Sequence, residues 1–103
     1  MVQLILTSFA KKSDALKFAG ELVSTHLAAC CTILPGATSV FEWKGKRETA
    51  GEVLLLIKTI SKNLPALKKF FNTRHPYELP EFLILNAKAG ARYAKWIRTS
   101  CLS

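Results

Sequence analysis

The fold is decided by the stretch Ser39-Val40-Phe41-Glu42-Trp43-Lys44-Gly45-Lys46, near the middle of the chain. Its first five residues alternate between two sets of side chains, which is the period-two pattern of a strand with two different faces. Lys44-Gly45-Lys46 then predicts a hairpin turn, in which Gly45 supplies a positive φ. We therefore expect a long hairpin, with arms running from about Ala29 to Trp43 and from Lys46 to Ile60.

Both arms of this hairpin contain a signal for an irregularity. Pro35-Gly36 interrupts the first arm and predicts a bend or bulge. Gly51 predicts another bulge in the return arm. The hairpin is also too long for a small domain to cover with two helices, so its free edges favour pairing with another subunit. Phe41 and Trp43 near its tip are predicted interface residues, because a monomer would expose them.

Shorter elements flank the hairpin on both sides. Val2 to Ser8 and Phe82 to Ala87 are apolar runs typical of strands. Ser13 to Leu27 predicts a helix capped by Ser13. The apolar stripe expected on this helix consists of Leu16, Ala19, Val23 and Leu27, with Ala15 and Leu22 beside it.

A second helix opens at Ser61 or Asn63 and ends at the His75-Pro76 step, because proline disfavours a helical residue before it. Gly90 precedes a final short helix. The order β-α-β-β-α-β predicts an α+β, ferredoxin-like fold: a four-stranded antiparallel sheet with two helices on one face. The final helix is an addition to that pattern.

Length and composition predict a single domain over residues 1–103 that associates with itself. Half of the 103 residues are hydrophobic, which is high for so short a chain and indicates apolar surface buried between subunits. The net charge of +8 is dispersed, so most of it is expected to be solvated surface rather than a nucleic-acid site.

The three cysteines have no paired spacing, which argues against a disulfide framework and for a reducing compartment. No apolar run is long enough for a membrane-spanning helix, and no signal-peptide pattern is present. These features predict a soluble, cytoplasmic protein without membrane insertion.

The chain closely resembles the CutA family of divalent-cation tolerance proteins. The residues that carry this resemblance are Leu27-Ala28-Ala29-Cys30, Ile33, Pro35-Gly36-Ala37-Thr38-Ser39, Phe41-Glu42-Trp43-Lys44-Gly45-Lys46, Glu52-Val53, Ile57-Lys58-Thr59, His75-Pro76-Tyr77-Glu78 and Pro80-Glu81. The resemblance implies a tight homotrimer joined at strand edges, similar to the trimeric PII signalling proteins. It also implies a role in tolerance to copper and other divalent ions, and no catalytic activity.

His75 is the main candidate metal ligand, because neutral imidazole binds copper and zinc well. The alternative is that it hydrogen-bonds the end of its helix. Arg74 cannot ligate, although some family members carry a second histidine there. The first strand also lacks the cysteine found in some metal-binding members. Both departures weigh against a metal site in this chain.

Three further ligands are proposed: the thiol of Cys30 and the carboxylates of Glu78 and Glu81. Cys30 lies in an apolar run, so an inert core role is the favoured alternative. By strand alternation, Cys31 is expected to point to the opposite face. The two glutamates could instead pair with lysines and arginines at a subunit boundary.

Tyr77 and Lys58 are candidate residues for binding a small ligand. Tyr77 could equally fill an interface and bond its hydroxyl there. Lys58 would attract an anionic effector from an intersubunit cleft, or pair with Glu78 or Glu81. No enzyme motif is found, and the Lys/Arg-Gly-aromatic signature of an RNA-recognition strand is absent.

Together these observations predict a non-enzymatic homotrimer that binds a divalent cation, Cu²⁺ or Zn²⁺, between its subunits. One alternative is a PII-like sensor of an anionic metabolite. The other is an adaptor trimer with no small ligand. Nucleic acid is not an expected partner in any of the three.

Overall fold

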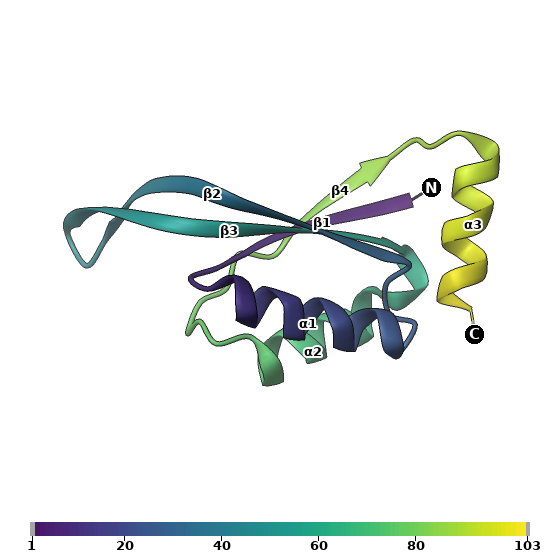
Figure 1. Cartoon of the computed structure of the whole chain (residues 1–103), viewed down its shortest axis with the longest axis horizontal. Coiled ribbons are helices and arrows are strands. Elements are labelled where there is room, and N and C mark those ends of the chain that lie inside the picture. Colours follow the sequence, from purple (N-terminus) through teal and green to yellow (C-terminus); the bar gives the residue numbers. More distant parts are fainter. Residues whose placement is uncertain (1, 103) are drawn as a thin grey trace.

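The computed structural model describes residues 2–102 and has the expected β-α-β-β-α-β order with a third helix at the end (Figure 1). The elements are β1 (Val2–Phe9), α1 (Lys12–Ser24), β2 (Cys30–Trp43), β3 (Lys46–Ile60), a 3₁₀ turn η1 (Ser61–Asn63), α2 (Leu64–Arg74), β4 (Leu83–Ala87) and α3 (Ala91–Cys101). The four strands form one antiparallel sheet in the order β2-β3-β1-β4. Helices α1 and α2 lie under one face of this sheet, and α3 lies at the end opposite the hairpin tip.

The β2–β3 hairpin has the tight turn predicted from its sequence. Trp43 pairs with Lys46, so Lys44 and Gly45 alone form the turn, with φ of 52° and 80°. Positive φ at both central residues is the geometry of a type I′ turn, whose twist matches that of the flanking strands. The hairpin projects well beyond the helices, and its tip has no helix beneath it (Figure 1).

The bulge predicted at Pro35-Gly36 is confirmed, and the one predicted at Gly51 is wrong. The β2–β3 register shifts between Leu34 and Ala37, where Gly36 has a φ of 84°. Gly51 instead pairs regularly with Thr38. Between the pairs that Leu34 and Ala37 form, β2 contains one residue more than β3, and the bulge in β2 accommodates it. The pairing of β3 is regular on both sides of this point.

The main core lies between the sheet and the helices α1 and α2. Ile5, Phe9 and Leu55 are fully buried on this face of the sheet. From α1, the buried residues are Ala15, Phe18, Ala19 and Leu22.

The stripe predicted for α1 was therefore placed too far around the helix. Leu16 and Val23 are 53% and 41% exposed. The physical reason is Phe18, whose ring packs against Phe9 and Phe71 and so sets which side of α1 faces the sheet. The helix also ends at Ser24, before Leu27, and its N-cap residue is Lys11 rather than Ser13.

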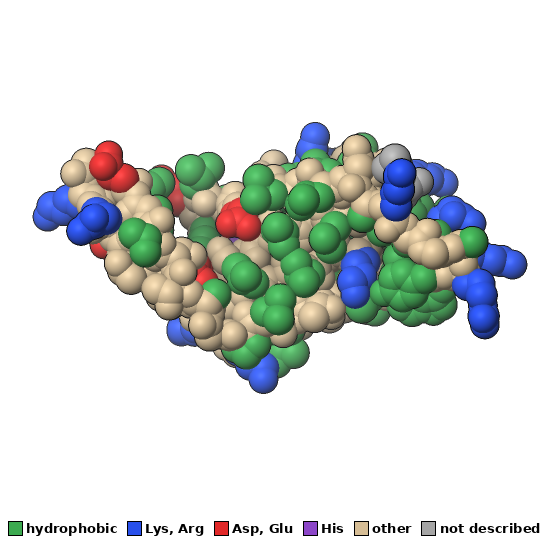
Figure 2. Space-filling view, turned by 90° about the horizontal axis from the view of Figure 1, so that it is seen from above, with side chains coloured by type: hydrophobic (Ala, Val, Ile, Leu, Met, Phe, Trp, Pro, Cys, Tyr) green, Lys and Arg blue, Asp and Glu red, His purple; other side chains and the backbone are tan. Residues whose placement is uncertain are grey.

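The opposite face of the sheet, which we call the open face, is largely uncovered. At one end, Ile97 and Cys101 of α3 pack against Val2 and Ala29. Beyond that contact, strand register places six leucines on the open face: Leu4, Leu6, Leu54, Leu56, Leu83 and Leu85. Figure 2 shows hydrophobic side chains gathered across this face.

Candidate functional site

The loop after α2 begins at His75, where the helix ends as the sequence predicts. The backbone of His75 is extended, with φ −73° and ψ 133°, because the ring of Pro76 excludes the helical conformation. Its N–H still donates to the carbonyl of Phe71, at 3.1 Å, and so closes the last turn. This geometry turns the imidazole back under the sheet.

The ring of His75 is buried among aromatic side chains and is 9% exposed. It stacks on Phe9, with ring centroids 4.4 Å apart, and on Phe71, at 5.8 Å. Phe18 meets it edge-on at 5.5 Å. Desolvation by this burial lowers the pKa of His75, and the hydrogen bond to the Ser8 carbonyl partly opposes the change.

Both ring nitrogens of His75 are hydrogen-bonded. Nδ1 accepts from the backbone N–H of Tyr77 at 3.1 Å. Nε2 lies 3.0 Å from the carbonyl oxygen of Ser8 and 3.1 Å from Oγ1 of Thr7. Since a carbonyl only accepts, the hydrogen-bond network assigns the proton to Nε2. Metal ligation by His75 stays a prediction, and it would cost one of these hydrogen bonds.

Tyr77 connects the loop to the base of the hairpin. Its hydroxyl donates to Oε2 of Glu52 at 2.9 Å. Burial, the hydrogen bond to Glu52 and the charges of Glu52 and Asp14 together raise the pKa of Tyr77 to about 12. Within one subunit the hydroxyl of Tyr77 is thus already hydrogen-bonded, and its roles at an interface or toward a ligand stay predictions.

Glu78 and Glu81 are exposed on the same loop. Within residues 2–102, neither makes a hydrogen bond or an ion pair in a single subunit. Glu78 lines a cavity of about 310 Å³ together with Trp43, Pro76, Tyr77 and Leu79. Trp43 of the hairpin and the loop therefore border the same hollow.

Lys58 and Cys30 meet on the open face, away from this loop. Lys58 Nζ lies 3.9 Å from Cys30 Sγ and 5.9 Å from the ring centroid of Tyr93. No carboxylate in the described part of the chain pairs with Lys58, so the predicted pairing with Glu78 or Glu81 does not occur within one subunit.

The core position predicted for Cys30 belongs to Cys31 instead. Cys31 pairs with Ile57 and packs against the main core. Burial, followed by the neighbouring thiol of Cys30, raises its pKa to about 12. The expected alternation of the two side chains is correct, but the register places Cys31 beside Ile57 on the covered face and Cys30 beside Lys58 on the open face.

One subunit does not bring the proposed metal ligands together. Cys30 pairs in register with Lys58, whose partner in β1 is Leu4. His75 contacts Thr7 and Ser8 near the other end of that strand. Among residues 2–102, no three His, Cys, Asp or Glu side chains lie close enough together to hold a metal ion.

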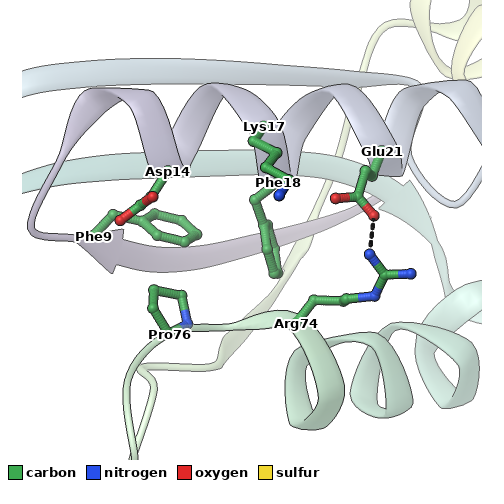
Figure 3. A pocket seen from close by; sticks show the side chains of 7 residues that line it. All are labelled: Phe9, Asp14, Lys17, Phe18, Glu21, Arg74 and Pro76. Carbon is green, nitrogen blue, oxygen red and sulfur yellow. Dashed lines mark hydrogen bonds and ion pairs between the residues drawn. The ribbon is translucent and has the colours of Figure 1, made fainter.

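A second hollow lies between α1 and the start of the loop, and sequence reasoning missed it (Figure 3). It has a volume of about 140 Å³ and is lined by Phe9, Asp14, Lys17, Phe18, Glu21, Arg74 and Pro76. Nη1 of Arg74 forms an ion pair with Oε2 of Glu21 at 2.7 Å. The spacing of Asp14, Lys17 and Glu21 along α1 was the available signal, because such residues share one side of a helix.

Comparison with known proteins identifies the family. A family model described as the CutA1 divalent ion tolerance protein matches residues 3–100. The chain belongs to the CutA1 family. A CutA1-family relative from Yersinia pestis (strain Pestoides F), the divalent-cation tolerance protein CutA, is 37% identical over 100 residues, covering 96% of this chain and 84% of that protein.

Solved CutA structures share the fold of this CutA1-family chain. CutA from Xylella fastidiosa superimposes with a TM-score of 0.92 at 39% identity, covering 97% of each chain. A protein from Archaeoglobus fulgidus, described as a periplasmic divalent cation tolerance protein, superimposes with a TM-score of 0.92 at 27% identity, covering 98% of this chain and 99% of the other. The predicted ferredoxin-like fold is confirmed.

The CutA1-family chain carries its few carboxylates unevenly. Of seven acidic residues, five belong to the hairpin or the loop beside it: Glu42, Glu48, Glu52, Glu78 and Glu81. On the face drawn in Figure 2, lysine and arginine side chains lie mainly at the two ends and along the edges. No helix within residues 2–102 has the length and apolar character needed to cross a membrane.

Proposed function

We propose that this CutA1-family chain acts in divalent-cation tolerance as a cytoplasmic homotrimer that binds a divalent cation between its subunits. The observation that carries the proposal is the uncovered apolar open face. The chain has no recognised catalytic motif, and the proposed function requires none.

The open face supports self-association because of its size and continuity. Leu34 on β2 is 44% exposed, and Leu83 and Leu85 on β4 are 53% and 45% exposed, so both edge strands carry exposed leucines. Monomeric soluble proteins rarely leave a contiguous apolar patch of this kind in water. Removing it from water would contribute roughly 25 cal/mol for each Å² buried. In the proposed trimer, two further copies of the chain bury this apolar face.

The free strand edges support the same assembly. Strands β2 and β4 are the two edges of the sheet, and their outer backbone groups have no partner strand in the described chain. Such edges pair readily with another chain. Phe41 and Trp43, 41% and 42% exposed near the hairpin tip, would then pack against the neighbouring subunit.

The carboxylates beside the hairpin base are the part of the chain best suited to a cation. Glu78 and Glu81 make no hydrogen bond within the described subunit, so their oxygens are available as ligands. Because no subunit holds three ligands by itself, the site would need side chains from two subunits. Cys30 of a neighbour, or His75 after loss of its bond from Tyr77, would supply the softer ligand that Cu²⁺ or Zn²⁺ prefers.

Lys58 favours a second candidate function, the binding of a small anionic effector as in PII proteins. Its ammonium group sits on the open face without a carboxylate partner among the described residues. A lysine in that position would attract an anion and repel a cation near Cys30. The metal and anion proposals therefore predict opposite effects of removing this charge.

The oligomer is tested by light scattering on the wild-type chain and two matched variants. Leu56→Glu places a charge on the open face, whereas Leu16→Glu places the same charge on the exposed side of α1. We expect trimer mass for the wild type and Leu16→Glu, and loss of the trimer in Leu56→Glu. A wild-type monomer at micromolar concentration would refute the assembly.

Ligand type is tested by calorimetric titration of Cu²⁺ and Zn²⁺ into the reduced, metal-free trimer. A Glu78→Gln/Glu81→Gln variant should weaken metal binding, while Glu48→Gln near the hairpin tip should not. Lys58→Met should strengthen or preserve metal binding, and should abolish binding of an anionic effector. A trimer that binds no metal in any form would refute the metal site and leave the anionic effector and the adaptor role as the two alternatives.

A further inference from the structure

The cleft between α1 and the start of the α2–β4 loop carries charges of opposite sign, and the proposed function does not use them. Pro76 lines the cleft on one side, and the rings of Phe9 and Phe18, which are 0% and 3% exposed, lie buried beneath it (Figure 3). The elements that line it, α1 and the start of the α2–β4 loop, lie on the helix-covered side of the sheet, opposite the open face (Figure 1). A ligand in this cleft and a partner subunit on the open face would thus occupy different surfaces.

Charged groups of opposite sign stand at the two ends of this cleft. Asp14 lies at the end next to Phe9, and Arg74 lies at the other end, bound to Glu21 (Figure 3). Asp14 and Glu21 are seven residues apart on α1, which separates their backbones by about 10 Å. Lys17 comes from the helical turn between them.

Two of these charged groups have no partner within residues 2–102. Asp14 and Lys17 make neither a hydrogen bond nor an ion pair there, although i, i+3 and i, i+4 spacing would allow pairing along the helix. Arg74 uses one nitrogen for Glu21, and its other guanidinium N–H groups remain available as donors. The cleft thus offers a free carboxylate at one end and free cationic donors in the middle and at the other end.

Asp14 lies near a second carboxylate, that of Glu52. The charge of Glu52 and, to a smaller extent, that of Asp14 both raise the pKa of Tyr77.

We propose that this cleft binds a short zwitterion, in which a primary ammonium and a carboxylate are separated by a few methylene groups. The ammonium lies against Asp14, and the carboxylate is held by Lys17 and Arg74. The methylene groups pack against Pro76, which is exposed and lines the cleft. A simple cation would meet repulsion from Lys17 and Arg74, and a simple anion would meet repulsion from Asp14 and Glu21.

The size of the cleft limits the ligand to a small one. Its volume of about 140 Å³ is below that of pockets for drug-sized molecules. A protein cavity of about 150 Å³ holds benzene. An ω-amino acid such as γ-aminobutyrate is therefore a suitable probe.

The test is a calorimetric titration of γ-aminobutyrate into the wild-type chain and three variants. Asp14→Asn and Lys17→Met each remove one of the proposed ligand contacts. Lys12→Met makes the same change as Lys17→Met on an exposed residue of α1 that does not line the cleft. We expect saturable binding that is weakened roughly tenfold or more by the first two variants and unchanged by the third.

Two compounds that each carry only one charge complete the test: n-propylamine and butyrate should both bind roughly tenfold or more weakly than γ-aminobutyrate. Amide shifts in NMR spectra should map to residues 14–21 and 74–76. Absence of binding, equal binding of either single-charge compound, or equal binding by Lys17→Met would overturn the proposal. Light scattering on the same samples reports the oligomer separately, so failure here is distinguishable from failure of the proposed function.

Discussion

The ring of His75 lies nearly parallel to the ring of Phe9, with centroids 4.4 Å apart and an interplanar angle of 16°. This stack places the imidazole within reach of the backbone at the end of β1, where Nε2 meets the carbonyl of Ser8. It also leaves Nδ1 to accept the N–H of Tyr77. One buried side chain therefore joins β1, the end of α2 and the loop that carries the acidic residues.

The stability of the chain should fall as the pH drops below about 6.5, the ordinary pKa of histidine. Burial lowers the pKa of His75 in the folded state, although the bond to Ser8 partly opposes it. The unfolded chain then takes up this proton at a higher pH than the folded chain. Stability present above the unfolded pKa is consequently lost as the pH falls toward the folded pKa. Urea unfolding at a series of pH values measures the effect.

His75→Gln is the variant that isolates this effect. It should be less stable than the wild type at neutral pH, because it loses the ring contacts, but its stability should vary less across the same pH range. His26→Gln changes the other histidine and should keep the wild-type pH dependence. An unchanged pH dependence in His75→Gln would show that another group is responsible.

Tyr77→Phe should reduce the free energy of unfolding by about 1 kcal/mol, because it removes a hydrogen bond to a carboxylate at a half-buried site. Tyr93→Phe is the matched control, since the Tyr93 hydroxyl makes no hydrogen bond within residues 2–102. A double-mutant cycle with Glu52→Gln gives the interaction energy directly. An interaction energy of zero would mean that the loop is held by His75 alone.

Cys31 should react with iodoacetamide at least roughly tenfold more slowly in the folded chain than in urea. Burial raises its pKa to about 12, which lowers the thiolate fraction, while the greater nucleophilicity of a thiolate of high pKa offsets part of that loss. Peptide mass spectrometry after timed labelling follows each cysteine separately. Labelling of folded Cys31 within about tenfold of the unfolded rate would contradict its placement in the core.

Lys44→Asn should stabilise the hairpin by about 0.5 kcal/mol, because asparagine tolerates the positive φ of this turn position better than lysine. Gly45→Ala should destabilise it by about 1 kcal/mol for the converse reason. Lys46→Asn changes the neighbouring strand residue in the same way and should bring no gain. Thermal unfolding measures the stability of the three variants. An equal gain in stability from asparagine at positions 44 and 46 would argue against a cause specific to the turn.

Local patterns were enough to predict most of the fold. The alternation around Phe41 and the Lys44-Gly45 turn predicted the hairpin, and the His75-Pro76 step predicted the end of α2. The errors concern choices that several local arrangements satisfy equally well. The α1 stripe could begin at residue 15 or 16, and Gly51 could sit in a bulge or in a regular ladder.

For the candidate site, too, the local sequence predicted some features, and contacts between distant residues decided the others. The loop from Arg74 to Glu81 was recognisable as a stiff, chemically rich connection, and the structure gives its residues distinct positions. His75 is buried and Tyr77 bonds Glu52, while Glu78 and Glu81 are exposed. The cleft that joins Asp14 and Lys17 to Arg74 had no counterpart in the sequence analysis, because its walls are about 60 residues apart in the chain.

The sequence by itself determined the order of the elements, the hairpin turn and the Pro35-Gly36 bulge. These depend on backbone preferences and side-chain periods expressed within a few consecutive residues. The family was indicated by a resemblance whose motifs are spread over the chain. Only the tertiary structure decided which side of α1 is buried, which cysteine lies in the core and how the nitrogens of His75 are used. Those outcomes depend on contacts between distant residues, such as Thr7 and His75, which are 68 positions apart and meet only when the aromatic core packs.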